Sequence, residues 1–350
     1  MSELKKVVFF GSDQIGLPIL ETLISAPLRA LVRLEAVYSQ PDRPSGRGCK
    51  IHPNAVVSWA RSYNIPVFQP EKLGPQDAAR LRELGCDIGL VMAYGHILKQ
   101  DMLDAPKIGF YNYHASLLPH FRGPAPVEAA IASGARGTGV TLQSIVPALD
   151  CGDVVGSAVI TLDDDSTRAS LRERISEACT FITIDTLPRI IHGDAEKIPQ
   201  PERHASYTRK ISRADSAIDF SAPARLIAAR TRALSPWPGC TFPFAGMELK
   251  LGHVEAVKVP GLPTDAPAGT VMAWTKGELL IATGVDFLHV HSLQRPGGRM
   301  LPARDFLAGM KIPAGTVLQS RPMRPLSQKT PWPREPKKPR PATPPSVPVA

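Results

Sequence analysis

The fold of the N-terminal half is decided by the stretch KIGFYNYHASLLPHFRGPAPVEAAI, residues 107–131. Its first eight residues have the length and apolar character of a buried strand, and a helical pattern begins at Val127 after a turn-rich segment. Side chains alternate along a strand, so Asn112 and His114 share one face and lie about 7 Å apart along it. In a parallel sheet both would stand at the carboxyl end of the strand, where open α/β sheets bind ligands.

Apolar runs and helical patterns alternate on both sides of this stretch. The strand-like runs are VVFF, LEAVYS, PVFQP, DIGLVMAY and VTLQSIV, at residues 7–10, 34–39, 66–70, 87–94 and 140–146. We expect helices at residues 54–63, 75–84 and 127–133, and a long closing helix capped by Asp165 or Ser166. Strands that alternate with helices are typical of βαβ units, so we predict an α/β fold with a Rossmann-like parallel sheet at residues 1–195.

The sequence pattern changes near residue 200. The polar, turn-rich segment IPQPERHASYTRKI indicates a linker at residues 196–210. One helical pattern follows and ends at SPWPG, residues 235–239. The remaining runs are short, strand-like and separated by Gly and Pro, which predicts a small OB-like β-barrel domain at residues 211–320, of the kind that binds oligonucleotides.

The last thirty residues carry most of the unusual composition. Residues 321–350 hold ten prolines and a net charge of +6, out of +9 for the chain of 350 residues. Such a segment cannot bury enough apolar surface to fold, so we expect a disordered Pro-rich basic tail. It is either a solubilising segment or a contact for nucleic acid.

Composition excludes several classes of protein. At 43% apolar and 21% charged residues, and a mean hydropathy of −0.07, the chain is neither mostly disordered, nor collagen, nor a coiled coil. No apolar run suffices for a transmembrane helix or a signal peptide. The five cysteines are dispersed without a CxxC pair, so we expect neither a disulfide framework nor a zinc site, and a cytoplasmic protein.

The candidate chemistry centres on Asn112, His114 and Asp150. An amide N–H and an imidazolium on one strand face can both donate to a developing oxyanion. Asp150 follows the strand at residues 140–146; if that strand neighbours residues 107–114, the carboxylate reaches His114 and stabilises its imidazolium form. Alternatives are that Asp150 only caps a turn, that His114 and Asp150 bind a metal, and that Ser116 is a nucleophile, although no G-x-S-x-G surrounds it.

Two glycine-containing segments have less specific meanings. GSDQIG, residues 11–16, does not match G-x-G-x-x-G, and no GK[ST] occurs, so a bound nucleotide is not indicated. PDRPSGRGCK, residues 41–50, places basic side chains between turn residues. It is either exposed surface or a loop that grips phosphates, with its glycines allowing close backbone approach.

Taken together, these segments resemble the methionyl-tRNA formyltransferases. The resemblance rests on VVFFGS, QPDRPSGRGCK, VFQPEKL, VMAYGHIL, the N-x-H-x-S-L-L-P-x-x-R-G core from Asn112 to Gly123, GVTLQSIVPALDCGDVV, SPWPG, APAGTV and LLIATG. It covers roughly residues 5–318. The N-x-H…SLLP…D motif alone is shared by the wider folate-dependent formyltransferases. The loop at residues 41–50 and the second domain narrow the resemblance to the methionyl-tRNA formyltransferases.

The resemblance implies an activity and a set of site residues. The expected reaction is transfer of the formyl group of 10-formyltetrahydrofolate to the α-amino group of methionine on initiator methionyl-tRNA, by an enzyme that needs no metal. Apart from the resemblance, we expect a monomer, because no amphipathic interface helix stands out in the sequence. The family's catalytic residues correspond to Asn112, His114 and Asp150. Its folate-binding residues correspond to Met92, Tyr94, Gly95, Ser116, Leu117, Leu118 and Pro119. Its tRNA-binding loop corresponds to Arg43, Gly46, Arg47, Gly48 and Lys50, with Cys49 where a basic residue is expected.

Two rival readings of the sequence share this scaffold. One is another folate formyltransferase or a formyltetrahydrofolate hydrolase, which has the same N-x-H…D site. Among these, a purine-pathway transformylase would lack the second domain, and an enzyme that acts on a sugar nucleotide would have little use for the loop at residues 41–50. The other is a catalytically silent RNA-binding protein. Activity with folate but without tRNA would favour the first rival, and tRNA binding without turnover the second.

Overall fold

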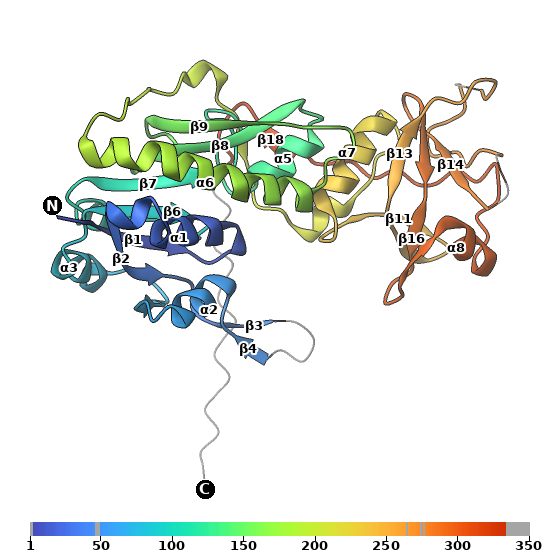
Figure 1. Ribbon diagram of the computed structural model, residues 1–350. Helices are drawn as coiled ribbons and strands as arrows, with labels where there is room; N and C mark the ends of the chain where they lie inside the picture. Colours follow the sequence, from blue (N-terminus) through green and yellow to red (C-terminus); the bar gives the residue numbers. More distant parts are fainter. Residues whose placement is uncertain (1–2, 46–49, 264, 274, 276, 334–350) are drawn as a thin grey trace, which may run out of the picture.

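The computed structural model describes residues 3–333, except residues 46–49, 264, 274 and 276 (Figure 1). A seven-stranded sheet in the order β5-β2-β1-β6-β7-β8-β9 forms the centre of the N-terminal domain. Its strands are β1 (Lys5–Gly11), β2 (Val32–Tyr38), β5 (Val67–Phe68), β6 (Ile88–Met92), β7 (Gly109–His114), β8 (Gly137–Ser144) and β9 (Val154–Thr161). The strands from β5 to β7 are parallel, as predicted.

Side chains on the two faces of the sheet belong to two separate hydrophobic cores. Val7 and Phe9 of β1 pack on the face covered by α1 (Leu17–Ile24), α5 (Pro126–Ala132) and α6 (Arg168–His192). Val8 and Phe10 pack on the opposite face, against α3 (Pro75–Glu83) and α4 (Gln100–Leu103). All four side chains are fully buried, which explains why VVFF reads as a continuous apolar run.

Three features of this domain differ from the sequence prediction. β8 and β9 run antiparallel to their neighbours, and β9 was not predicted, because its outward side chains alternate with only a few buried ones. The N-cap of α6 is Thr167, neither Asp165 nor Ser166: its hydroxyl accepts from the Ser170 amide at 3.1 Å. Ser166 instead accepts a hydrogen bond from the Asp163 amide in the preceding turn.

The C-terminal domain consists mainly of antiparallel strands. Helix α7 (Ala224–Leu234) leads into the sheet β11-β12-β16-β17, and the second sheet has the order β13-β15-β14. The strands are β11 (Cys240–Phe244), β12 (Met247–Leu251), β13 (Val254–Val257), β14 (Leu279–Ala282), β15 (Phe287–Val290), β16 (Ser292–Gln294) and β17 (Met300–Pro302). A short helix, α8 (Ala303–Gly309), was not predicted. α5 and α7 lie side by side where the domains meet.

Two short pairs of strands lie outside these sheets. β3 (Arg43–Ser45) and β4 (Lys50–His52) form a hairpin that projects from the N-terminal domain, followed by α2 (Ala55–Ser62) (Figure 1). β10 (Tyr207–Thr208) pairs with β18 (Ser327–Gln328). Within the described residues, no helix is both long enough and apolar enough to cross a membrane. The described cysteines, which exclude Cys49, are free thiols.

The prediction of disorder from residue 321 is wrong for residues 321–333. β18 hydrogen-bonds to the linker, Leu326 is 5% exposed, and the Trp332 indole donates to the Tyr207 carbonyl at 2.9 Å. Averaged composition hides these two apolar anchors among prolines and charges. Residues 334–350 lie outside the described part of the chain.

Candidate active site

Strands β7 and β8 position the residues that the sequence singled out. Asn112 lies opposite Gln143, and His114 lies opposite Thr141. Residues directly opposite in an antiparallel pair point to the same face, so these four side chains form one group at the end of β7. His114 is 5% exposed and Asn112 is half-buried.

The structure brings His114 and Asp150 together. His114 Nδ1 lies 3.7 Å from Asp150 Oδ2, and His114 Nε2 lies 2.9 Å from the Phe121 carbonyl oxygen, to which it can donate. Of the two contacts only that of Nε2 is a hydrogen bond, whereas Nδ1 faces the Asp150 carboxylate without bonding to it. Because 3.7 Å exceeds a hydrogen-bond distance, Nδ1 is the nitrogen left to donate to a reacting oxygen or a water between the two groups.

The Asp150 carboxylate is fixed by two donors. Gly123 N–H donates to Oδ2 at 2.8 Å, and the Gln143 amide donates to Oδ1 at 3.1 Å. Asp150 itself has φ +53°, a left-handed conformation that Asp tolerates better than most residues. The adjacent Gly152 is packed so closely that a Cβ there would collide with the Ser144 carbonyl oxygen. The turn thus holds one Asp150 carboxylate oxygen 3.7 Å from His114 Nδ1.

The sequence reasoning missed Gln200, which ties the linker to this turn. Its amide nitrogen lies 2.9 Å from the Asp150 carbonyl oxygen, 2.7 Å from that of Gly152 and 3.2 Å from Gln143 Oε1. No motif marks Gln200, because it lies in a polar linker fifty residues from its partners. The strand alternation from Thr141 could have indicated Gln143, which faces the same side.

Arg122 holds Gln200 in place and is itself fully paired. Its side chain is fully buried and donates to Gln200 Oε1 at 2.8 and 3.1 Å, to both Glu202 carboxylate oxygens at 2.7 and 3.0 Å, and to the Tyr207 hydroxyl at 3.0 Å. Buried guanidinium groups need such complete pairing, since an unpaired buried charge is strongly destabilising. Arg122 therefore joins the N-terminal domain, the linker and, through Tyr207, the Trp332 indole.

The segments expected to bind folate flank His114, and several of their side chains are engaged internally. Ser116 is fully buried and donates to the His120 carbonyl oxygen at 2.5 Å. The Thr141 hydroxyl binds Ser116 O at 2.7 Å and Leu118 N at 3.0 Å, which fixes the backbone of this segment, while Leu117 and Leu118 are half-buried and Pro119 is buried.

The second segment expected to bind folate begins where β6 ends, at Met92. Met92 and the Tyr94 ring are both buried, and Tyr94 packs edge-on against Phe10. Gly95 follows with φ +84°, and Gln40 donates to the Tyr94 carbonyl oxygen. A ligand at this edge would therefore meet the backbone near Gly95, not the Tyr94 ring.

Only part of the predicted tRNA loop belongs to the described chain. Arg43 lies on β3, is exposed, and pairs with Glu71 at 2.7 Å. Lys50 begins β4, opposite Ser45. Gly46, Arg47 and Gly48 lie outside the described residues.

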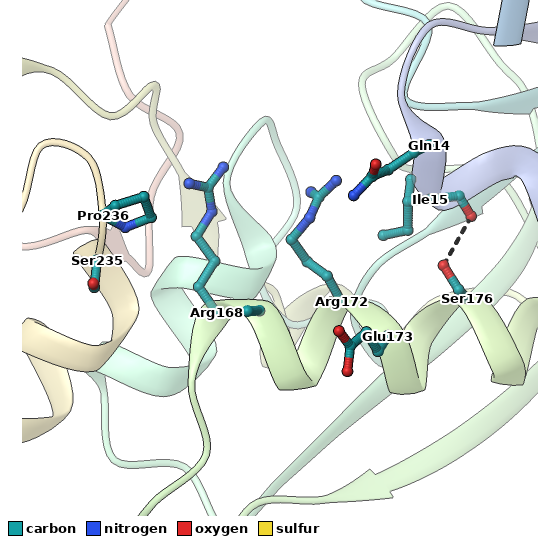
Figure 2. A pocket seen from close by; sticks show the side chains of 9 residues that line it. Gln14, Ile15, Arg168, Arg172, Glu173, Ser176, Ser235 and Pro236 are labelled. Atoms are coloured by element: carbon teal, nitrogen blue, oxygen red, sulfur yellow. Dashed lines mark hydrogen bonds between the residues drawn. The ribbon is translucent and has the colours of Figure 1, made fainter. Parts of the chain in front are cut away.

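A cavity of about 300 Å³ lies beside the segment that follows β1 and the first turns of α6 (Figure 2). It is lined by Gln14, Ile15, Arg168, Ala169, Arg172, Glu173, Ser176, Ser235 and Pro236. Arg172 pairs with Asp13 and Arg168 with Glu128 at 2.8 Å, so both cations are already neutralised. Its lining contains no residue of the predicted catalytic trio.

Comparison with known proteins extends over both domains. The formyl transferase family model matches residues 5–187, and the model of the formyl transferase C-terminal domain matches residues 210–311. The chain is 35% identical to methionyl-tRNA formyltransferase of Halorhodospira halophila over 314 residues, which are 90% of this chain and 99% of the relative. It is 38% identical to the protein of the same name from Methylococcus capsulatus over 303 residues, 86% of this chain and 96% of the relative.

A solved structure shares the fold at lower identity. The N-formyltransferase of Helicobacter canadensis, in complex with folinic acid and dTDP-3-aminofucose, is 17% identical with a TM-score of 0.62, covering 84% of this chain and 100% of that one. That likeness shows the fold alone. The sequence identity over both domains shows the family: the chain belongs to the formyl transferases, in the group of the methionyl-tRNA formyltransferases.

Proposed function

We propose that this enzyme transfers the formyl group of 10-formyltetrahydrofolate to the α-amino group of methionine on initiator methionyl-tRNA, in the cytoplasm and as a monomer. The observation that carries the proposal is the relationship to methionyl-tRNA formyltransferases over nearly the whole length of both domains. The cluster of Asn112, His114 and Asp150 at one strand end supplies the polar groups that the reaction needs.

The reaction begins with attack by the uncharged amine. A free α-amino group titrates at a pKa of about 7.7–8.0, so a substantial share is uncharged near neutral pH. The amine nitrogen bonds to the formyl carbon, and the carbonyl electron pair moves to oxygen. The tetrahedral intermediate collapses when the bond from this carbon to folate N10 breaks, and the proton released by the amine ends on N10.

The proposed roles of the three residues follow from their geometry. Asn112 and the Nδ1–H of His114 donate to the oxyanion. Asp150, fixed by Gly123 and Gln143, stabilises the imidazolium and relays the proton from the amine toward N10 through water. Loss of one oxyanion donor typically lowers kcat on the order of 100- to 1000-fold.

The tRNA surface in this proposal comprises the basic hairpin and the C-terminal domain. Arg43 and Lys50 stand on its two paired strands, β3 and β4. Phosphate contacts of this kind make binding weaken as salt rises. The proposed contacts from Gly46, Arg47 and Gly48 rest on the family resemblance alone.

An acceptor panel tests the substrate. Purified enzyme and 10-formyltetrahydrofolate are incubated separately with initiator methionyl-tRNA, elongator methionyl-tRNA, a nucleotide-linked amino sugar and buffer alone. Formylation confined to the initiator tRNA supports the proposal. Formylation of the amino sugar, or release of formate without tRNA, contradicts it and favours the other folate-dependent activities; tRNA binding without turnover would favour the silent RNA-binding reading.

A further inference from the structure

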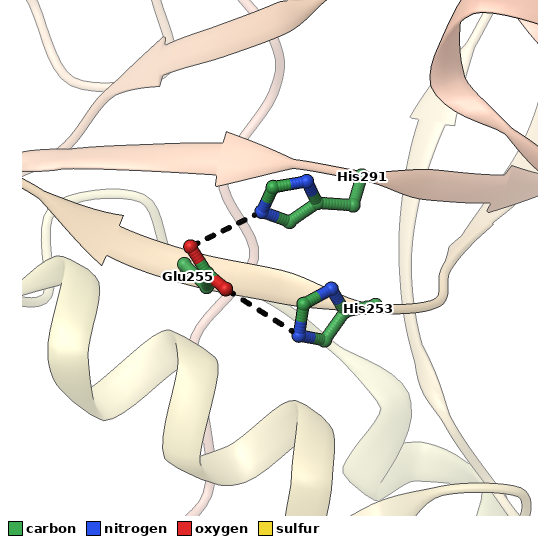
Figure 3. Close-up of side chains that lie close together, drawn as sticks. All are labelled: His253, Glu255 and His291. Atoms are coloured by element: carbon green, nitrogen blue, oxygen red, sulfur yellow. Dashed lines mark ion pairs between the residues drawn. The ribbon is translucent and has the colours of Figure 1, made fainter. Parts of the chain in front are cut away.

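Three side chains of the kinds that bind metal ions gather in the C-terminal domain, and none of them is among the residues named for formyl transfer. His253, Glu255 and His291 converge on one another (Figure 3). They come from two neighbouring antiparallel strands: His253 and Glu255 flank Val254 at the start of β13, and His291 directly follows β15. Residues two apart on a strand share a face, so the sequence pattern H-x-E opposite H-x-H gathers four potential ligands on one surface.

The backbone register brings these side chains together. Glu255 lies opposite His289, and Val254 lies opposite Val290, which places His253 opposite His291. The His291 amide donates to the His253 carbonyl oxygen at 2.9 Å, extending the ladder by one residue pair. Directly opposite side chains in such a ladder have Cβ atoms about 4.5–5.5 Å apart, close enough to share one ion.

The distances between donor atoms are close to those of a metal centre. Glu255 lies 3.2 Å from His291 Nε2 and 3.7 Å from His253 Nε2, and one ligand atom from each residue lies within 4.8 Å of the others. Ligand atoms about 2.0–2.1 Å from a tetrahedral Zn²⁺ lie roughly 3.3–3.4 Å apart. Small side-chain rotations, without backbone movement, therefore suffice to seat an ion.

The backbone beneath the cluster is already fixed. Gly252 N–H donates to the Ser292 carbonyl oxygen at 2.9 Å, and His253 N–H donates to Ser292 Oγ at 2.8 Å. At this point β12 continues into β13 and β15 continues into β16, so both strands pass from one sheet to the other. An ion held here would join the two strands at the place where the sheets meet.

We propose that His253, Glu255 and His291 bind one divalent transition-metal ion of the zinc class, with water completing the coordination. Two imidazoles and a carboxylate are ligands that Zn²⁺ accepts, and the open fourth position suits an exposed site. His289, whose ring centroid lies 4.0 Å from that of His291, stands beside the cluster and pairs with Glu278 at 4.0 Å. The site stabilises the C-terminal domain, and the proposal is independent of the proposed formyl transfer.

The test measures metal binding directly. The full-length protein, without a histidine tag, is freed of metal with a chelator and titrated with Zn²⁺ alone in a calorimeter. We expect one ion per chain in the wild type and a Kd at least ten-fold higher in His253→Ala and in His291→Ala. His192→Ala, an exposed histidine on α6, is the matched control and should leave the Kd unchanged.

Two further measurements exclude trivial explanations. Titration with Co²⁺ should give absorption without thiolate charge-transfer bands, since free cysteines would otherwise be the binding groups. Glu255→Gln keeps the shape of the side chain and should also weaken Zn²⁺ binding, which separates loss of a ligand from loss of folding. Absence of one-to-one binding in the wild type, or an unchanged Kd in both histidine variants, would overturn the proposal.

Discussion

Replacing Gln200 by leucine tests whether the linker holds the Asp150 turn in place. The change keeps the volume of the side chain but removes two acceptor contacts to Arg122 and the amide that donates to the Asp150 and Gly152 carbonyl oxygens. Each buried polar group left without a partner costs about 1–3 kcal/mol. The turn also loses the bonds that offset the φ of +53° at Asp150.

The expected effect divides between stability and rate. If displacement of the Asp150 carboxylate raises the activation free energy by about 2 kcal/mol, kcat falls about 30-fold, because each 1.36 kcal/mol corresponds to a factor of ten. The affinity for tRNA should change little, since Gln200 contacts the backbone of the Asp150 turn and is not among the residues proposed to bind tRNA. Single-turnover formylation of initiator methionyl-tRNA at saturating folate measures the rate, and the dependence on tRNA concentration measures KM.

A matched control separates positioning from general damage. Gln76→Leu makes the same chemical change on the exposed face of α3 and should leave both parameters unchanged. Thermal unfolding of Gln200→Leu shows how much of the effect is stability. A kcat within three-fold of the wild type, in a protein with an unchanged KM, would refute the idea that Gln200 positions the Asp150 carboxylate.

Three further changes have defined outcomes. A chain ending at residue 320 loses β18 and the Trp332 contact, so by calorimetry it should melt several degrees lower than a chain ending at residue 333; equal Tm values would contradict the docking of this segment. Burial alone would raise the pKa of Asp215, but hydrogen bonds from Arg209 and Ser212 outweigh burial and lower that pKa. The ionised carboxylate therefore stabilises the fold at pH values above the ordinary Asp pKa, near 4, and this contribution is lost as the pH falls below that value. Asp215→Asn should therefore reduce the free energy of unfolding by about 3 kcal/mol at pH 7 and by less near pH 3, as urea titrations would show; a pH-independent difference would exclude this linkage. Gly152→Ala should lower kcat at least ten-fold through collision with the Ser144 carbonyl, while Gly137→Ala, where a Cβ meets only one oxygen at 3.5 Å, should not; equal rates in single-turnover assays would argue against a tightly fitted turn.

The sequence predicts most of the N-terminal domain because its signals are local. Apolar runs of four or five residues mark β1 and β6, and alternation along β7 puts Asn112 and His114 on one face. The proximity of Asp150 follows from the order of β7 and β8 in the sheet. These inferences require only periodicity and the rule that consecutive strands usually lie next to each other.

The supporting residues could not be predicted because their partners are distant in sequence. Arg122 is fully buried, yet it stands among prolines and glycines in a segment that reads as a surface turn. Its burial becomes favourable only when Gln200, Glu202 and Tyr207 fold over it. Residues 327–328 pair with the same linker, so the structure of this segment also escapes composition-based reasoning.

The central claim is that His114 acts with Asn112 and Asp150 in formyl transfer to initiator methionyl-tRNA. The most direct measurement is the single-turnover rate of that transfer for the wild type and for Asn112→Ala, His114→Ala and Asp150→Asn, with elongator methionyl-tRNA in parallel. The account predicts rapid formylation of the initiator tRNA by the wild type alone and losses of about 100-fold or more in every variant with little change in Tm. Wild-type rates in the His114 variant, or no transfer to the initiator tRNA by the wild type, would contradict it.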